Sequence, residues 1–145
     1  MRVAVDDRAI RLRLDEQTHE IAGPDIGAIF LDGKDLVVLG VSTEELVRLP
    51  NDRDRTRLAE AFSAHGYPWR PDGDPHSGEY RRWVDETPDL PGPVNAVFKA
   101  RERALGKGDS DDAAALRAEL AKLGFVVRDE GSYQYWRRVP GWAHD

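Results

Sequence analysis

The chain has 145 residues, the usual size of one domain or of two small domains that share an interface. Hydrophobic residues make up 40% of it and charged residues 33%, a composition typical of a soluble globular protein. Cysteine is absent, which excludes disulfides, thiolate zinc sites and cysteine nucleophiles. The net charge of −6 has the wrong sign for a protein that binds nucleic acid with its whole surface.

The N-terminus has no apolar stretch of the kind found in signal peptides, and no apolar run approaches the ~20 residues that a membrane helix needs. These features predict a cytoplasmic location. The 4 histidines are scattered among the charged residues and form no ligand pattern, so we expect no metal and no cofactor. No nucleophile, base and acid converge in the sequence, so we do not expect an enzyme.

Charge and composition divide the chain into three segments, residues 1–70, 71–92 and 93–138. The middle segment is acidic and rich in Pro and Gly, and is therefore interpreted as a connection. Tyr80, Trp83 and Val84 have helical spacing, which predicts one short helix packed against a neighbouring domain.

The first segment shows the alternation of β-strands. Ile10, Leu12 and Leu14 alternate with Arg11 and Arg13, which indicates a strand with one buried face and one basic, solvated face.

Further strands are expected along the same segment. A second short run ends at Ile21, and the Asp-Gly turn of residues 32–35 between two apolar runs, 28–31 and 36–39, indicates a hairpin. A last strand around residues 46–48 stops at Pro50. Asn51 or Asp52 then caps a helix that includes Leu58 and Phe62.

The third segment contains two helices and a hairpin. Apolar residues between 94 and 105 fit one helix, and a second helix, capped by Asp109 or Ser110, runs to Gly124. The runs 125–127 and 133–136 flank the Asp-Glu-Gly turn of residues 129–131 as a second β-hairpin. The predicted fold class is therefore α+β.

The third segment, residues 93–138, resembles the C-terminal tail of cysteinyl-tRNA synthetases. The residues that carry this resemblance are Ala115, Leu116, Arg117, Leu120, Gly124, Val126, Asp129 and Trp136, with Ala100 and Arg101 in the preceding helix. The sequence departs from that tail at Ala114, where the synthetases usually have Asp, and at Gly131, where the turn glycine comes earlier. Motifs for synthetase catalysis and its zinc ligands are absent, which excludes aminoacylation.

The first segment resembles the bacterial pleckstrin-homology-like (PH-like) domains, most recognisably between Ile26 and Trp69. This resemblance implies a small antiparallel β-barrel or sandwich closed by a C-terminal helix. The two halves in this order resemble the bacterial YqeB family, whose usual description includes membrane-spanning helices ahead of the PH-like part. Whether such helices precede Met1 in a longer chain stays open.

Two groups of residues are candidate binding sites. Aromatic rings interleaved with arginines stack bases and hold phosphates, so an RNA or anion site is expected from five residues of the third segment: Arg101, Arg117, Tyr135, Arg137 and Arg138. Trp136 lies among these residues and could stack a base in the same way. We favour the alternative, that Trp136 is part of the small core. Arg11 and Arg13 are candidates for contact with anionic lipid headgroups.

The sequence thus predicts a non-catalytic binding or scaffold module that has an unknown protein or membrane partner, at the inner face of the membrane if spans precede it. The alternative is RNA binding, most plausibly of tRNA, through the third segment, because residues 93–145 carry one more basic than acidic side chain.

Overall fold

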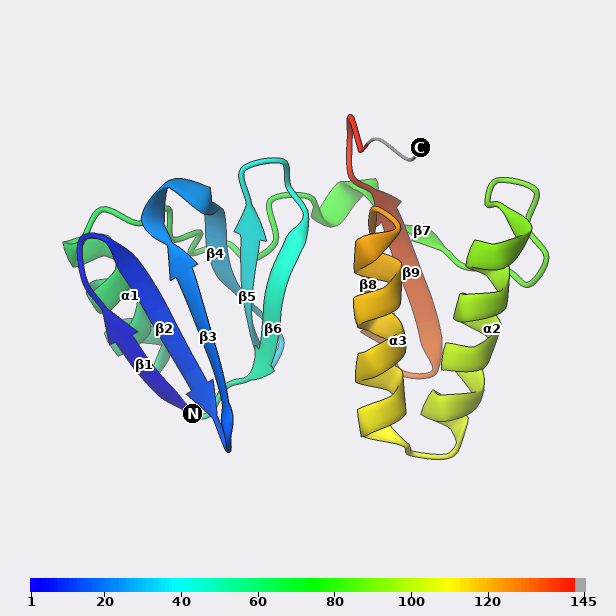
Figure 1. Cartoon of the computed structure of the whole chain (residues 1–145), viewed down its shortest axis with the longest axis horizontal. Helices are drawn as coiled ribbons and strands as arrows, with labels where there is room; N and C mark the ends of the chain where they lie inside the picture. Colours follow the sequence, from blue (N-terminus) through cyan, green and yellow to red (C-terminus); the bar gives the residue numbers. More distant parts are fainter. Residues whose placement is uncertain (143–145) are drawn as a thin grey trace. The chain divides into compact units, whose positions relative to one another are not determined.

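The computed structural model describes residues 1–142 and divides the chain into two compact units, Met1–Ser77 and Gly78–Asp145 (Figure 1). The first unit contains β1 (Arg2–Val5), β2 (Ala9–Leu14), β3 (Gln17–Ala22), the 3-10 turn η1 (Gly23–Asp25), β4 (Ile26–Asp32), β5 (Asp35–Gly40), β6 (Glu45–Pro50) and α1 (Arg55–Ala64). The turn η2 (Ser77–Glu79) crosses the boundary. The second unit contains β7 (Arg81–Arg82), α2 (Gly92–Gly106), α3 (Ser110–Lys122), β8 (Phe125–Glu130) and β9 (Tyr133–Arg138).

The first unit is built from two three-stranded antiparallel sheets, β1-β2-β3 and β4-β5-β6. Side chains from both sheets share one core, and α1 packs Leu58 and Phe62 onto it. Phe62 is fully buried and its ring stacks on Trp69 with centroids 5.9 Å apart. The expected closure of the sheets by a C-terminal helix is therefore present.

Of the two expected architectures, barrel or sandwich, the closed barrel is not formed. Within residues 1–142 no strand pairing joins the two sheets. The turn η1 explains this, because it ends β3 and carries the chain into the second sheet instead of letting the next strand pair with β3. The free edge of β4 is covered by the segment after α1, where Ile29 N–H donates to the Pro68 carbonyl and Arg70 N–H to the Ile29 carbonyl.

Helix α1 starts later than expected. Its N-cap is Asp54, whose carboxylate accepts a hydrogen bond from the Thr56 N–H, and neither Asn51 nor Asp52 has this role. Asn51 instead closes a local turn by accepting from the Arg53 N–H. Because the cap is Asp54, residues 51–53 are free to turn the chain between the end of β6 at Pro50 and the start of α1.

The second unit packs α2 and α3 against the sheet β7-β9-β8. Its core contains the buried Trp136 and Phe98 together with Leu120, as the interpretation of Trp136 as a core residue requires. Asp109 caps α3 by accepting from the Asp112 N–H.

The short helix expected at residues 80–84 is absent, and the prediction was wrong. Arg81 and Arg82 form the strand β7, which pairs with Trp136 and Tyr135 of β9. Trp83 is buried, as expected, and stacks on Phe98 at 5.6 Å, whereas Val84 is 62% exposed. The backbone groups on the free edge of β9 pair with Arg81 and Arg82 when these residues are extended. A one-turn helix at residues 80–84 would leave those groups of β9 without partners.

Candidate functional site

The outer face of the sheet β1-β2-β3 carries three exposed arginines, Arg2, Arg11 and Arg13, which we call the arginine face. Their placement follows from the alternation of side chains along a strand. Ile10 and Leu12 of β2 are fully buried in the core, so the residues between and after them point to solvent. The structure therefore brings the two predicted residues of β2 together with a third arginine, from β1.

The three arginines differ in their partners. Arg11 Nε donates to Glu20 Oε1 of β3 at 2.8 Å, in a pair whose side chains are both more than half exposed. Arg13 Nε reaches the Asp15 carbonyl at 3.4 Å, at the limit of a hydrogen bond. Within residues 1–142, Arg2 makes no hydrogen bond or ion pair through its side chain.

Arg2 and Arg13 are directly opposite each other in the β1–β2 register. Like charges in that position destabilise a sheet. Both residues line a shallow hollow of about 390 Å³ that also contains Met1 and Asp15. An anion seated between the two guanidinium groups would relieve their repulsion, which makes this hollow the strongest candidate anion site in the first unit.

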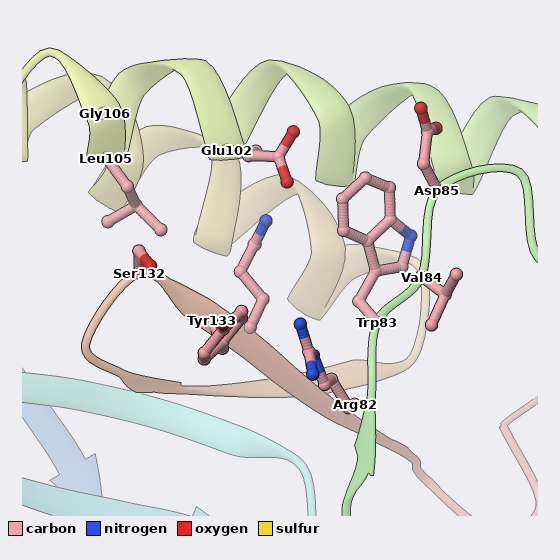
Figure 2. Close-up of a pocket in the computed structure, with 10 residues that line it drawn as sticks. Arg82, Trp83, Val84, Asp85, Glu102, Leu105, Gly106, Ser132 and Tyr133 are labelled. Carbon is pink, nitrogen blue, oxygen red and sulfur yellow. The ribbon is translucent and has the colours of Figure 1, made fainter.

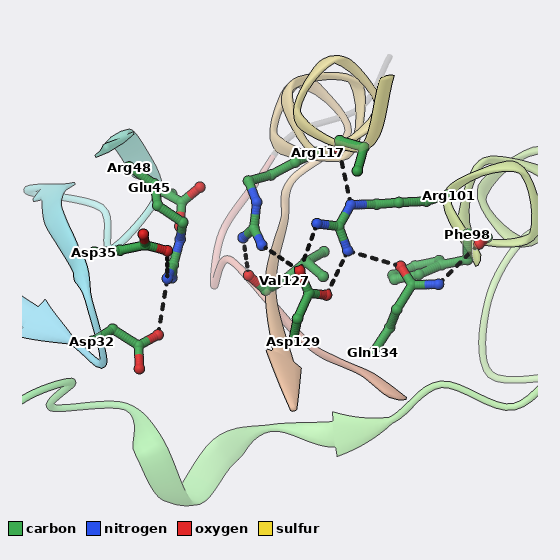
Figure 3. Close-up of polar contacts among 11 residues, drawn as sticks. Asp32, Asp35, Glu45, Arg48, Phe98, Arg101, Arg117, Val127, Asp129 and Gln134 are labelled. Atoms are coloured by element: carbon green, nitrogen blue, oxygen red, sulfur yellow. Dashed lines mark hydrogen bonds and ion pairs between the residues drawn. The ribbon is translucent and has the colours of Figure 1, made fainter. Parts of the chain in front are cut away.

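The structure places Arg101 in the interior of the second unit, where its side chain is 2% exposed (Figure 3). Its guanidinium binds the Asp129 carboxylate in a bidentate pair, with N–O distances of 2.6 and 2.8 Å. Arg101 Nε donates to the Ala113 carbonyl, and Nη1 also donates to Gln134 Oε1. Gln134 in turn donates to the Phe98 carbonyl at 3.0 Å.

Arg117 completes the same network. It donates to the Val127 carbonyl and, at 3.1 Å, to Asp129 Oδ2 (Figure 3). Arg101 and Arg117 thus tie α2 and α3 to the β8–β9 hairpin through one carboxylate. Their guanidinium groups are engaged inside the unit, so we do not retain them as anion ligands.

The remaining predicted ligands of the third segment are Tyr135, Arg137 and Arg138. All three lie on β9, but they do not share one exposed surface. Arg138 is exposed and donates to the Asp89 carbonyl. Arg137 and Trp136 point to opposite faces of β9, yet Arg137 is only 2% exposed, which does not suit its predicted role as an RNA or anion ligand. The guanidinium of Arg137 lies 5.7 Å from the ring centroid of Tyr80, while Tyr135 is partly buried.

A stacked pair that the sequence analysis missed lies beside β9. The Arg82 guanidinium is 3.8 Å from the centroid of the Tyr133 ring, which is 50% exposed. Both residues line a pocket of about 380 Å³, toward which Glu102 and Leu105 reach from α2 (Figure 2). The signal was hidden because Arg82 and Tyr133 come together only through the pairing of β7 with β9.

Arg48 of β6 forms a second internal cluster, in the first unit (Figure 3). Its guanidinium contacts Glu45 at 2.8 Å, Asp32 at 2.9 Å and Asp35 at 3.4 Å. Burial by itself lowers the pKa of Arg48, but Glu45 and Asp32 raise it by more, so the net pKa lies above its ordinary value. The ion pairs of this cluster therefore connect β4, β5 and β6.

The hairpin between β1 and β2 holds an ordered carboxylate. Asp6 Oδ1 accepts from the backbone N–H groups of Arg8, at 2.8 Å, and Ala9, at 3.0 Å, and these bonds lower the pKa of Asp6. The Tyr67 hydroxyl donates to the Asp6 carbonyl at 2.6 Å. Burial and the nearby Asp6 and Asp7 charges raise the pKa of Tyr67.

Metal-binding clusters and membrane-spanning helices are both absent from the described residues. Residues 1–142 contain no group of three or more His, Asp or Glu side chains arranged to hold a metal ion. In the same range, no helix has the length and apolar character required to span a bilayer.

Comparison with known families matches both halves of the chain. Residues 1–70 match the YqeB-like bacterial PH domain, and residues 87–137 match the cysteinyl-tRNA ligase anticodon binding domain. No solved structure gives a significant match.

The uncharacterized protein YqeB of Bacillus subtilis (strain 168) is 41% identical to this chain over 137 residues. The alignment covers 94% of this chain and 57% of that relative, so the chain spans little more than half of the relative's length. The chain is therefore similar to YqeB over most of its own length, and its two halves match, in order, a YqeB-like bacterial PH domain and the cysteinyl-tRNA ligase anticodon binding domain.

Proposed function

We propose that the chain is a non-catalytic binding module whose first unit contacts an anionic membrane surface through the arginine face. The observation that carries this proposal is the cross-strand pair of Arg2 and Arg13. Two like charges held opposite each other lower the stability of the sheet, and an anion would offset that cost. The matched domains are a PH domain and the anticodon binding domain of a ligase, and neither description names a catalytic domain, which supports binding over catalysis.

The arginine face sets the strength of the expected contact. A basic side chain near an anionic membrane contributes about 1 kcal/mol, so three arginines contribute about 3 kcal/mol. That amount corresponds to roughly a hundredfold change in partitioning. Because the whole chain carries a net charge of −6, only this face is expected to approach the membrane, and added salt weakens the contact. The same proposal places the protein at the cytoplasmic leaflet, where anionic lipids are concentrated.

Vesicle flotation tests the proposal. The chain is mixed with phosphatidylcholine vesicles that contain or lack phosphatidylserine, and the bound fraction is measured. We expect binding only with phosphatidylserine, and a roughly hundredfold loss in the variant that combines Arg2→Gln, Arg11→Gln and Arg13→Gln.

The matched control removes the same number of charges elsewhere. Arg57, Arg70 and Arg103 are exposed, and none makes a side-chain ion pair or hydrogen bond within residues 1–142. Their triple change to Gln should leave vesicle binding nearly intact. Equal losses in the two triple variants would show that total charge, and not the arginine face, drives the binding.

RNA binding by the second unit is the second candidate. It is supported by the match to an anticodon binding domain and by the exposed Tyr133 ring under Arg82. A ring and a guanidinium so placed form a platform on which a base can stack. Within this candidate the ligand residues are Arg82, Tyr133 and Arg138.

A gel shift with bulk tRNA tests this candidate. Binding should fall steeply as salt is added, because several phosphates would be contacted. Tyr133→Leu should weaken binding by about tenfold, the loss expected for one stacked base, whereas Val84→Leu, an exposed change on the same pocket, should not. The absence of any shift at low salt would remove RNA from consideration.

A further inference from the structure

The open edges of the two sheets in the first unit face a common groove. β3 is an edge strand of its sheet and β6 is an edge strand of the other. Between them lies a groove of about 580 Å³, which we call the edge groove. No strand pairing crosses this groove within residues 1–142.

The backbone of β3 presents unpaired groups on its outer edge. The hairpin with β2 closes at Leu14 and Gln17, and Gly23 N–H donates to the Arg8 carbonyl at 2.8 Å, which fixes the alternation of bonded and non-bonded pairs. By that alternation the N–H and C=O groups of three residues point away from β2: Thr18, Glu20 and Ala22. All three residues line the edge groove.

Apolar and polar side chains in the groove are also left without partners. Val41 is 68% exposed and Leu46 is 39% exposed, although both are large hydrophobic residues. The Nε2 atom of His19 is buried and has no hydrogen-bond partner within residues 1–142. A buried nitrogen of this kind calls for a partner that the chain itself does not supply.

The charge of the groove has one sign. Its lining includes the carboxylates of Asp25 and Glu44, together with that of Glu20, which pairs with Arg11, and contains no lysine or arginine. An occupant with positive side chains therefore complements the groove, whereas a second copy of this acidic chain does not.

We propose that the edge groove binds an extended, basic segment of a partner protein, which adds as a strand to the outer edge of β3. Its backbone would pair with Thr18, Glu20 and Ala22, as in other cases of strand addition to a sheet edge. Alternate side chains would cover Leu46 or face the acidic groups, because successive side chains of a strand point to opposite faces. This inference goes beyond the proposed membrane contact by giving the class of a protein partner. The edge groove borders the arginine face, because Glu20 lines the groove and also pairs with Arg11.

The probe is a short acetylated and amidated peptide of alternating lysine and valine, titrated into the whole chain labelled with ¹⁵N. We expect amide shifts confined to β3, η1 and the start of β6. Ala22 has φ −66°, which proline adopts without strain, so Ala22→Pro removes one outward N–H while the pairing with β2 is kept. This variant should bind the peptide at least tenfold more weakly, and Ala22→Val, which retains the N–H, should bind normally.

A second variant tests the charge without touching the backbone. Asp25→Lys should weaken binding of the lysine–valine peptide and favour a peptide of alternating glutamate and valine. Equal binding of both peptides by the unchanged protein, or unaltered affinity in Ala22→Pro, would overturn the proposal. Light scattering that shows a dimer abolished by Ala22→Pro would overturn it too, since the groove would then serve a second copy.

Vesicle flotation of Ala22→Pro separates this inference from the proposed membrane contact. The variant should bind phosphatidylserine vesicles as the unchanged protein does, because the arginine face is intact. Loss of peptide binding with vesicle binding retained supports the edge groove as an independent site.

Discussion

Arg101 shows how a single side chain can be misassigned from sequence. An arginine on a helix that resembles an RNA-binding tail is a reasonable anion ligand, but its actual partner, Asp129, lies 28 residues further along the chain. No local spacing reports that pairing. The burial of Trp136 could be predicted, because tryptophan is highly buried on average in folded proteins.

Replacing Arg101 should destabilise the second unit. Arg101→Met keeps the length of the side chain but leaves the Asp129 carboxylate without its bidentate partner. Removal of one partner from a buried ion pair costs about 3–5 kcal/mol. We expect about 3 kcal/mol, the lower end of that range, because Asp129 keeps Arg117 and its side chain is 26% exposed.

Urea unfolding followed by tryptophan fluorescence measures this change. Arg103→Met, at an exposed position of the same helix, is the control and should shift the free energy of unfolding by less than about 0.5 kcal/mol. If Arg101→Met is as stable as its control, the network is not what holds the helices to the hairpin.

Asp6 gives a prediction on pH. Its pKa is lowered by the N–H groups of Arg8 and Ala9, from an ordinary value of 3.8. A folded pKa below the unfolded one means that the stabilisation is fully present above pH 3.8 and is lost as the pH falls through the lower folded value. In Asp6→Asn the free energy of unfolding should no longer show this loss as the pH falls. An NMR titration that places the Asp6 carboxyl at or above 3.8 would contradict this assignment.

At the scale of elements, strands with clear turns were predictable. The Asp-Gly turn of residues 32–35 located the β4–β5 hairpin, and the alternation of β2 located its buried face. β7 was not predictable, because two residues are too short to show alternation and their strand character depends on β9. The same dependence hid the Arg82–Tyr133 pair, so this part of the candidate site required the structure.

The β4–β5 pair contains a close backbone approach that a side chain cannot enter. A Cβ atom added at Gly27 would lie 2.4 Å from the Gly40 carbonyl oxygen, next to the shift in register between Ile26 and Ala28. Gly27→Ala should therefore force the strands apart and cost about 1–3 kcal/mol.

Gly78 provides the control for this change, because an added Cβ there meets nothing within 4 Å. Thermal unfolding of the two alanine variants compares them directly. If Gly27→Ala unfolds at the same temperature as Gly78→Ala, the strands accommodate the added methyl group at the register shift without loss of stability.

At the scale of the whole molecule, charge and composition set what the chain can bind. The net charge of −6 restricts anion binding to local faces, and the arginine face is one such place. The sequence predicted Arg11 and Arg13 from alternation, but Arg2 joins them only through the β1–β2 register. The edge groove was hidden for a similar reason, because the resemblance to PH-like domains allowed a closed barrel.

The central claim is that the first unit, through its arginine face, is the part of the chain that contacts an anionic membrane. Amide shifts of the ¹⁵N-labelled whole chain, titrated with nanodiscs of phosphatidylcholine and phosphatidylserine, test it most directly. We expect shifts at Arg2, Arg11 and Arg13 and their strand neighbours, reversed by added salt. Shifts confined to residues 78–142, or shifts unaffected by salt, would contradict it.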